Sequence, residues 1–189
     1  MLTLRLLDEK ETALLYEQHM RRDFPPSELK HLSSITAMQR RGCYDVLGAY
    51  ESNRLIAYAL LYRPEQGRIL LLDYLAVLPA YRNRGNGRAL MTLLRSYYAA
   101  AADVLMIECE RPKAAPDEQE ARLRIRFYEG AGAVLTNVRI WLFEVEYSIL
   151  VFPCGTMPEG EDWAQRMLSI YRQMLPQELY ERNVRLIRG

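Results

Sequence analysis

The sequence predicts an α/β fold. The hydrophobic period changes repeatedly along the chain, and two apolar runs of strand length flank a helical stretch. The 189 residues suffice for one well-buried core with an added element, and half of them are apolar, as in ordinary globular proteins. We therefore expect one domain over residues 1–152 and a helical extension over 153–189.

The N-terminal part is expected to hold an edge strand followed by two helices. Residues 2–7 alternate enough for an edge strand, and Asp8 can cap a helix that extends to about residue 19. Pro25 and Pro26 end that helix. A second helix is expected to begin at Ser27 and to run to about residue 41.

A hairpin and a buried strand come next. Residues 44–51 and 54–62 have strand patterns and are joined at Ser52 and Asn53. The run ILLLDYLAVL, from residue 69, is apolar throughout, as expected of a central strand buried on both faces. After a glycine-containing segment, residues 88–102 have helical composition, and VLMIECE, from residue 104, is another buried strand. A strand, a helix and a strand of these lengths imply a right-handed parallel crossover.

The segment ARLRIRFYEGAGA, residues 121–133, fits two periodicities. Its arginines alternate with apolar residues as in a strand, whereas Leu123 with Phe127 fits a helix. We expect a helix, because Asp117 and Glu120 can form a capping box before it and two glycines follow.

Two strands and a tail complete the chain. The strands are expected at about residues 133–136 and 139–151. Beyond Pro153 the tail has an apolar helical face that should dock on the body of the protein or on a second subunit, as in a homodimer. This face consists of Trp163, Met167, Ile170, Tyr171 and Met174.

Composition excludes several functional classes. With 25 basic and 24 acidic residues, the chain has no global basic field, so neither nucleic acid nor a membrane is an expected partner. Three distant cysteines without CxxC spacing favour a reducing compartment and argue against disulfides and a metal site. The apolar stretch at the N-terminus is too short and too soon interrupted by charged residues for a signal peptide. No apolar run approaches the length of about 20 residues that a membrane-spanning helix needs. A cytoplasmic protein is expected.

The segment LPAYRNRGNGRAL, from residue 78, predicts an anion site. It lies between a buried strand and a helix, whose N-terminus exposes unpaired N–H groups. Gly85 and Gly87 would let the backbone close around oxygen atoms that a Cβ would keep out. Positive charge around them comes from Arg82, Arg84 and Arg88. A phosphate or a pyrophosphate is the expected ligand.

Two nucleotide motifs do not fit this segment. A nucleotide phosphate-binding loop needs Lys and then Ser or Thr after its last glycine, where this chain has Arg88 and Ala89. A dinucleotide fingerprint needs a third glycine, and position 90 is leucine. What remains is RxxGxG, from Arg82 to Gly87, preceded by LAVLPAYR.

This phrase resembles the acetyl-CoA-binding motif of the GNAT superfamily of N-acetyltransferases. The matching positions are Leu75, Val77, Pro79, Tyr81, Arg82, Gly85 and Gly87. The order of elements over residues 1–152 is also similar to that family. The resemblance implies a central, mostly antiparallel sheet with one splayed parallel strand pair and helices on both faces. It also implies acetyl-CoA as the acyl donor and a primary amine as the acceptor.

The resemblance also assigns cofactor-binding residues. Backbone groups of Leu75, Ala76 and Val77 should pair with the pantetheine arm of acetyl-CoA. The pyrophosphate should lie against the segment formed by Arg82, Asn83, Arg84, Gly85, Asn86, Gly87 and Arg88. An asparagine that the family often has before its tyrosine is replaced by Arg122, which removes a frequent contact to the cofactor.

The chemistry implied is direct attack of the amine on the thioester. Tyr128, in FYEGAGA, stands where the family often has the tyrosine that gives a proton to the sulfur; the alternative is a packed helix residue. A phenol pKa of about 10 lies above that of a thiol, about 8.5. Glu108 and Glu110 lie two apart on one strand, so they should share a side, and either could accept the amine proton.

One further carboxylate and two rival functions stay open, one of them a nucleotide-dependent enzyme that merely reuses an anion-binding turn. Asp73 lies in an apolar run, so it should be either a substrate contact or a buried partner of an arginine. A protein that kept the acyl-CoA pocket could instead be a non-catalytic sensor or interaction module. In such a binder, Tyr128 with Glu108 or Glu110 would be superfluous, so their presence favours an enzyme.

Overall fold

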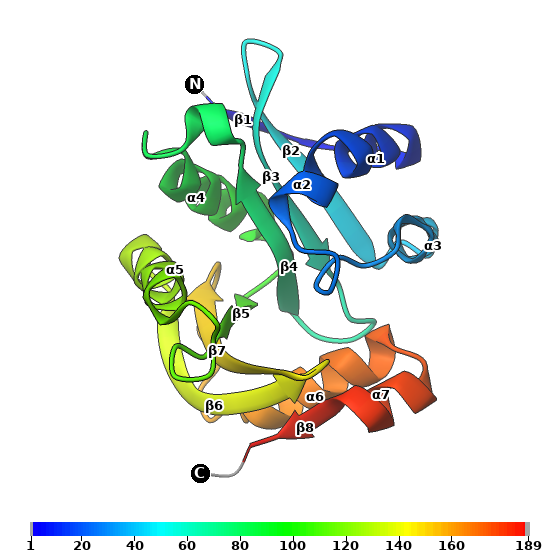
Figure 1. Ribbon diagram of the computed structural model, residues 1–189, viewed down its shortest axis with the longest axis vertical. Coiled ribbons are helices and arrows are strands. Elements are labelled where there is room, and N and C mark those ends of the chain that lie inside the picture. The colour runs from blue at the N-terminus through cyan, green and yellow to red at the C-terminus, as the bar shows by residue number, and fades with distance from the viewer. Residues whose placement is uncertain (1, 188–189) are drawn as a thin grey trace. The chain divides into compact units, whose positions relative to one another are not determined.

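The structure, a computed structural model, describes residues 2–187 and shows a mixed α/β fold (Figure 1). This confirms the predicted fold class. The chain divides into two units with dense internal contacts. The first consists of the residues up to 65 together with 72–97, and the second of 66–71 together with the residues from 98 onward. Strand β4 (Ile69–Val77) passes from the second unit into the first.

The strands of the first unit follow the predicted order. They lie in the order β1, β2, β3, β4, and the first three are β1 (Thr3–Leu6), β2 (Tyr44–Glu51) and β3 (Arg54–Tyr62). β1 is the edge strand and pairs antiparallel with β2. β2 and β3 form the expected hairpin, and its turn residues Ser52 and Asn53 both have positive φ. Such a turn matches the right-handed twist of the paired strands.

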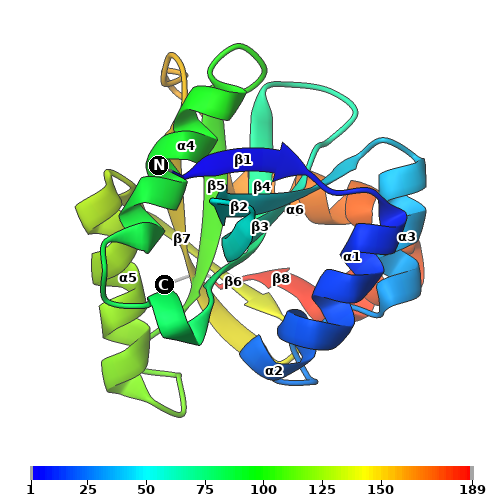
Figure 2. The same ribbon diagram turned by 90° about the horizontal axis from the view of Figure 1, so that it is seen from above.

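The helices of the first unit lie on both sides of its strands (Figures 1 and 2). Asp8 caps the first helix by accepting a hydrogen bond from the N–H of Glu11. The Glu11 carboxylate accepts one from the N–H of Asp8, so the two residues form a capping box. α4 lies on the opposite side from α1, α2 and α3. The helical segments are α1 (Glu9–Leu15), η1 (Tyr16–Met20), α2 (Arg21–Asp23), α3 (Leu32–Arg40), η2 (Pro79–Tyr81) and α4 (Asn86–Tyr98).

The helix expected from Ser27 begins only at Leu32, so that prediction was wrong at its start. Residues 25–31 are not helical, and 26–28 form a turn. The N–H groups of Glu28 and Leu29 donate to the carbonyl of Pro25, and the N–H of Lys30 donates to the Tyr74 hydroxyl. Their hydrogen bonds are thus made outside a helix.

The strands of the second unit pair antiparallel throughout. Their order is β5, β7, β6, β8, with β5 (Val104–Glu110), β6 (Val134–Leu142), β7 (Val145–Pro153) and β8 (Val184–Leu186). Residues 66–71 belong to this unit through Arg68. Its carbonyl accepts from the N–H of Asp103 at 2.7 Å, and its guanidinium pairs with the Asp103 carboxylate at 3.0 Å.

The ambiguous segment is the helix α5 (Glu118–Ala131), as predicted. The Asp117 side chain accepts a hydrogen bond from the N–H of Glu120 at 2.9 Å. At the other end Gly132 has φ 105°, a left-handed conformation that ends the helix at low cost. Three arginines at alternate positions therefore lie on a helix and do not indicate a strand.

The two strands expected at residues 133–136 and 139–151 were placed wrongly. β6 continues through residues 137 and 138, where no strand was expected. Its pairing with β7 is irregular between Leu135 and Arg139, and there the Thr136 hydroxyl accepts a hydrogen bond from the N–H of Val138 at 3.1 Å. The hairpin turn lies later, at Phe143 and Glu144, and both have positive φ. Neither residue type signals such a turn, which explains the error.

The C-terminal segment packs within the second unit. α6 (Trp163–Met174) contacts β6 and β8, and α7 (Gln177–Asn183) contacts β8. The predicted apolar face of α6 is buried at Met167, Ile170, Tyr171 and Met174. The segment also adds β8, which the sequence analysis did not predict. No helix among the described residues is long and apolar enough to cross a membrane.

Buried tyrosines are expected to make the protein less stable in alkaline solution. Burial raises the pKa of Tyr44 and Tyr58 well above the ordinary value of about 10. Above about pH 10 the unfolded chain would ionise while the folded phenols stay protonated, so each phenol lowers the free energy of unfolding by about 1.4 kcal/mol per pH unit.

Urea unfolding between about pH 8 and about pH 11 measures this effect. Tyr58→Phe should make the alkaline decline shallower, whereas Tyr97→Phe, at an exposed tyrosine, should not. A free energy of unfolding that stays constant over this range would contradict the expectation.

Candidate functional site

The predicted anion-binding segment forms a tight turn after β4. Residues Pro79–Tyr81 make one 3₁₀ turn, and Asn83 and Gly85 then take left-handed backbone conformations with φ 59° and 77°. A Cβ added at Gly85 would meet nothing within 4 Å. Glycine is therefore needed here for the backbone conformation, and the space beside it is open.

Side chains within the first unit brace this turn. The Arg82 Nε donates to the Val77 carbonyl at 2.9 Å, and its guanidinium lies 3.7 Å from the Asp23 carboxylate. The Asn86 amide donates to the Tyr81 carbonyl at 2.8 Å. The turn thus keeps its shape through contacts of its own.

The segment ends in the first turn of α4, which begins at Asn86, two residues before the predicted start. Gly87 lies in that turn, and the turn carries no acidic side chain. Arg84 and Arg88 are exposed. Unpaired N–H groups, the helix dipole and exposed guanidinium groups all favour an anion here. That this anion is a pyrophosphate stays a prediction.

The β4 residues predicted to pair with a pantetheine arm are largely buried. Ala76 is buried, and Leu75 and Val77 are half-buried. The carbonyl of Val77 already accepts the hydrogen bond from Arg82. A carbonyl can accept a second one, so the contact does not prevent the predicted pairing.

Asp73 has partners inside the first unit. Its carboxylate is 4% exposed and pairs with the Lys30 ammonium at 2.8 Å. The Tyr44 hydroxyl donates to its other oxygen, and the Lys30 ammonium also lies 5.2 Å from the centre of the Tyr74 ring. Asp73 is therefore a buried ion-pair partner, of a lysine where an arginine was expected. A substrate contact by Asp73 stays a prediction.

Tyr128 lies near the end of α5 and is 7% exposed. Burial raises the pKa of its phenol above the ordinary value, and the nearby Cys109 thiol raises it further, while Arg124 lowers it. None of the described residues forms a hydrogen bond with its hydroxyl. Tyr128 is consequently a neutral donor whose hydroxyl has no hydrogen-bond partner among residues 2–187.

Cys109 is a buried thiol, as expected. Burial raises its pKa to about 12, so the thiol stays protonated and is a poor nucleophile at neutral pH.

The two candidate carboxylates on β5 have different partners. Glu108 accepts a hydrogen bond from the Tyr171 hydroxyl of α6 at 2.6 Å. Glu110 lies 3.6 Å from the Arg124 guanidinium of α5. Each carboxylate is thus linked to a different helix of the second unit.

The matched part of the sequence decides the family. Residues 9–132 match the family model described as the acetyltransferase (GNAT) family. The chain belongs to the GNAT family of acetyltransferases. The resemblance carried by the RxxGxG segment is thereby confirmed. A search of curated protein sequences found no match.

Solved GNAT structures share the fold at low sequence identity. A protein described as an acetyltransferase of the GNAT family from Bacteroides thetaiotaomicron is 17% identical, with a TM-score of 0.75 over 92% of this chain and 99% of that one. The ribosomal-protein-S18-alanine N-acetyltransferase from Escherichia coli is 19% identical, with a TM-score of 0.63 over 86% and 100%. The spermidine N-acetyltransferase from Vibrio cholerae, solved with CoA and spermine, is 13% identical, with a TM-score of 0.62 over 80% and 95%.

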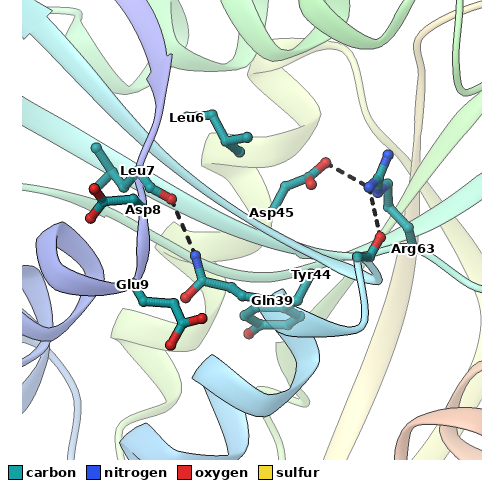
Figure 3. A pocket seen from close by; sticks show the side chains of 9 residues that line it. Leu6, Leu7, Asp8, Glu9, Gln39, Tyr44, Asp45 and Arg63 are labelled. Carbon is teal, nitrogen blue, oxygen red and sulfur yellow. Dashed lines mark hydrogen bonds and ion pairs between the residues drawn. The ribbon is translucent and has the colours of Figure 1, made fainter.

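A cavity of about 310 Å³ in the first unit is lined by residues of β1, α1, α3 and β2 and by Arg63 (Figure 3). None of its lining residues was predicted to bind acetyl-CoA or an amine. Arg63 pairs with Asp45 at 3.3 Å, and Gln39 donates to the Leu7 carbonyl at 3.2 Å. Among the described residues, no group of three His, Cys, Asp or Glu side chains could hold a metal ion.

Three polar contacts of this GNAT protein escaped the sequence analysis. Lys30 and Tyr44 bind Asp73, and Tyr171 binds Glu108. Of these residues, only Tyr171 could be recognised from the sequence as needing a polar partner. Its hydroxyl lies on an otherwise apolar helical face, and a buried hydroxyl forms a hydrogen bond.

Proposed function

We propose that this GNAT protein transfers an acetyl group from acetyl-CoA to a primary amine by direct attack of the amine on the thioester. The turn after β4 carries the proposal. It combines left-handed backbone at Asn83 and Gly85, open space beside Gly85, and a helix N-terminus without acidic side chains. These features suit a pyrophosphate, and the two named neighbours from Escherichia coli and Vibrio cholerae are N-acetyltransferases.

The residues present fit acetyl-CoA. The backbone from Arg82 to Arg88 would hold the pyrophosphate, with Arg82 already fixed on the Val77 carbonyl. The backbone of Leu75, Ala76 and Val77 would pair with the pantetheine arm. When bound, acetyl-CoA supplies an activated acyl group whose leaving group is a thiolate.

Tyr128 and a carboxylate of β5 would supply the proton transfers. Tyr128 donates a proton to the departing sulfur, and its buried phenol is in the protonated form that this step requires. Glu108 or Glu110 accepts the proton that the amine loses, directly or through a water molecule. A carbon–nitrogen bond forms, the carbon–sulfur bond breaks, and one proton leaves the amine for each proton taken up by sulfur.

A thiol-release assay with acetyl-CoA and a panel of amines tests this proposal. The panel should contain a polyamine, free amino acids, a lysine side chain and a peptide with an N-terminal alanine. We expect protein-dependent release of CoA with at least one of these amines. Stabilisation by CoA without any release would indicate the alternative, a non-catalytic acyl-CoA sensor, and indifference to CoA would refute both functions.

Gly85→Ala is expected to remove CoA-dependent stabilisation. A left-handed alanine costs about 1 to 2 kcal/mol, and its methyl group would point into the open space where the pyrophosphate should lie. For the natural protein, CoA at 100 times its Kd should add about 2.7 kcal/mol to the free energy of unfolding. Thermal unfolding with and without CoA measures both effects.

Gly160→Ala is the matched control. Gly160 also has positive φ, and a Cβ there would likewise meet nothing within 4 Å. This variant should lose similar stability yet keep its full response to CoA. Equal responses of the two variants would remove Gly85 from the binding site.

A further inference from the structure

A helix of the C-terminal segment holds the Glu108 carboxylate. The Tyr171 hydroxyl donates to Glu108 Oε1 at 2.6 Å, and 63 residues separate the two in the chain. Tyr171 is buried, and Glu108 is half-buried on β5. A hydrogen bond this short to a carboxylate is among the stronger ones found in proteins.

Packing fixes the position of the Tyr171 side chain. Met167, Ile170 and Met174 are buried on the same face of α6. Asp162 caps the start of the helix by accepting from the N–H groups of Ala164 and Gln165. A hydroxyl presented from a capped and packed helix has little freedom, so it can hold a carboxylate in one orientation.

We propose that Tyr171 is a positioning residue for acetyl transfer. Its hydrogen bond orients the Glu108 carboxylate and favours the ionised form, which is the form that accepts the amine proton. The inference rests on the proposed function, with Glu108 rather than Glu110 as the base. It also gives the C-terminal segment a part in the reaction.

Charged groups on β5, α5, β6, β7 and α6 have ion-pair partners of their own. Glu110 pairs with Arg124, Glu146 pairs with Arg111 at 2.7 Å and with Arg139 at 3.8 Å, and Arg166 pairs with Glu161 at 2.9 Å. Besides Glu108, these elements carry the following titratable and charged groups: Cys109 and Glu110 on β5; Glu118, Glu120, Arg122, Arg124, Arg126, Tyr128 and Glu129 on α5; Arg139 on β6; Glu146 and Tyr147 on β7; and Arg166, Tyr171 and Arg172 on α6. Glu108 and Glu110 both act on the Cys109 thiol and raise its pKa.

Tyr171→Phe tests the inference through the pH profile of kcat/KM. Without the hydrogen bond the Glu108 carboxylate should ionise at higher pH. The acid limb of the profile, where kcat/KM falls as the base becomes protonated, should therefore shift by about one pH unit to higher pH. On that limb kcat/KM should fall about tenfold, and well above it the variant should approach the natural enzyme. The KM for acetyl-CoA should not change.

Tyr180→Phe is the matched control. Tyr180 is also a tyrosine of the C-terminal segment, but its contacts are with Arg172. Its variant should keep the position of the acid limb. A loss of activity by Tyr171→Phe that is uniform with pH would indicate a merely structural role and overturn the inference.

Glu108→Gln separates the inference from the function on which it rests. This variant should lose the acid limb together with most of its activity. If it keeps both, Glu108 is not the base and the inference fails, while acetyl transfer itself stands. If Glu108→Gln loses the limb and Tyr171→Phe leaves it in place, only the positioning role is refuted.

A titration of the Glu108 carboxyl carbon by NMR gives a readout that does not depend on activity. The pKa of Glu108 should be higher in Tyr171→Phe than in the natural protein. Equal values would overturn the inference even if no acceptor amine had been found.

Discussion

Tyr128→Phe is expected to lower kcat by about 10²- to 10⁴-fold, the usual contribution of a proton donor in the transition state. The ring remains, so the affinity for acetyl-CoA should not change. The hydroxyl makes no hydrogen bond with the described residues, so its removal should leave the free energy of unfolding nearly unchanged. Steady-state kinetics of thiol release and thermal unfolding measure the two quantities.

Tyr62→Phe is the control for that variant. Tyr62 is also buried, at 3% exposed, and burial likewise raises the pKa of its phenol. It has no part in the proposed reaction, so its variant should turn over normally. A fully active Tyr128→Phe would instead return Tyr128 to the packed helix residues.

Lys30→Met should lower the free energy of unfolding by about 3 kcal/mol, because it leaves the buried Asp73 carboxylate without its cation. The Tyr44 hydroxyl still donates to Asp73, but it supplies no charge. Urea unfolding at neutral pH measures the effect.

The exposed ion pair of Arg40 with Glu9 provides a comparison. It is shorter, at 2.6 Å, but its side chains are 66% and 40% exposed. Arg40→Ala should therefore lower the free energy of unfolding much less than Lys30→Met does. If Lys30→Met costs no more than Arg40→Ala, Asp73 is not the buried charge that the structure indicates.

Local features of the fold were predictable from short stretches of sequence. Ser52 and Asn53 tolerate left-handed backbone, so the first hairpin was placed correctly. The same turn geometry at Phe143 and Glu144 gave no signal, because neither side chain favours it. The late start of α3 has a similar cause, since the N–H of Lys30 bonds to the hydroxyl of Tyr74, which is 44 residues away.

In the candidate site, too, local features were predictable and long-range contacts were not. The turn with Asn83 and Gly85 could be predicted because its chemistry lies within one continuous segment. The partners of Asp73 and Glu108 are separated from them by 43 and 63 residues, and no local pattern specifies such pairs. Sequence reasoning could show that a buried carboxylate needs a partner, but it could not identify the partner.

The interleaved division of the chain has a consequence for its synthesis. Residues 66–71 leave the ribosome before residues 72–97, yet they belong to the unit that is made last. The ion pair between Arg68 and Asp103 therefore cannot form until Asp103 has been made, and residues 72–97, which complete the first unit, are made before it. Nascent chains stalled after residue 97 should thus contain the whole first unit together with residues 66–71, before Asp103, the partner of Arg68, has been translated.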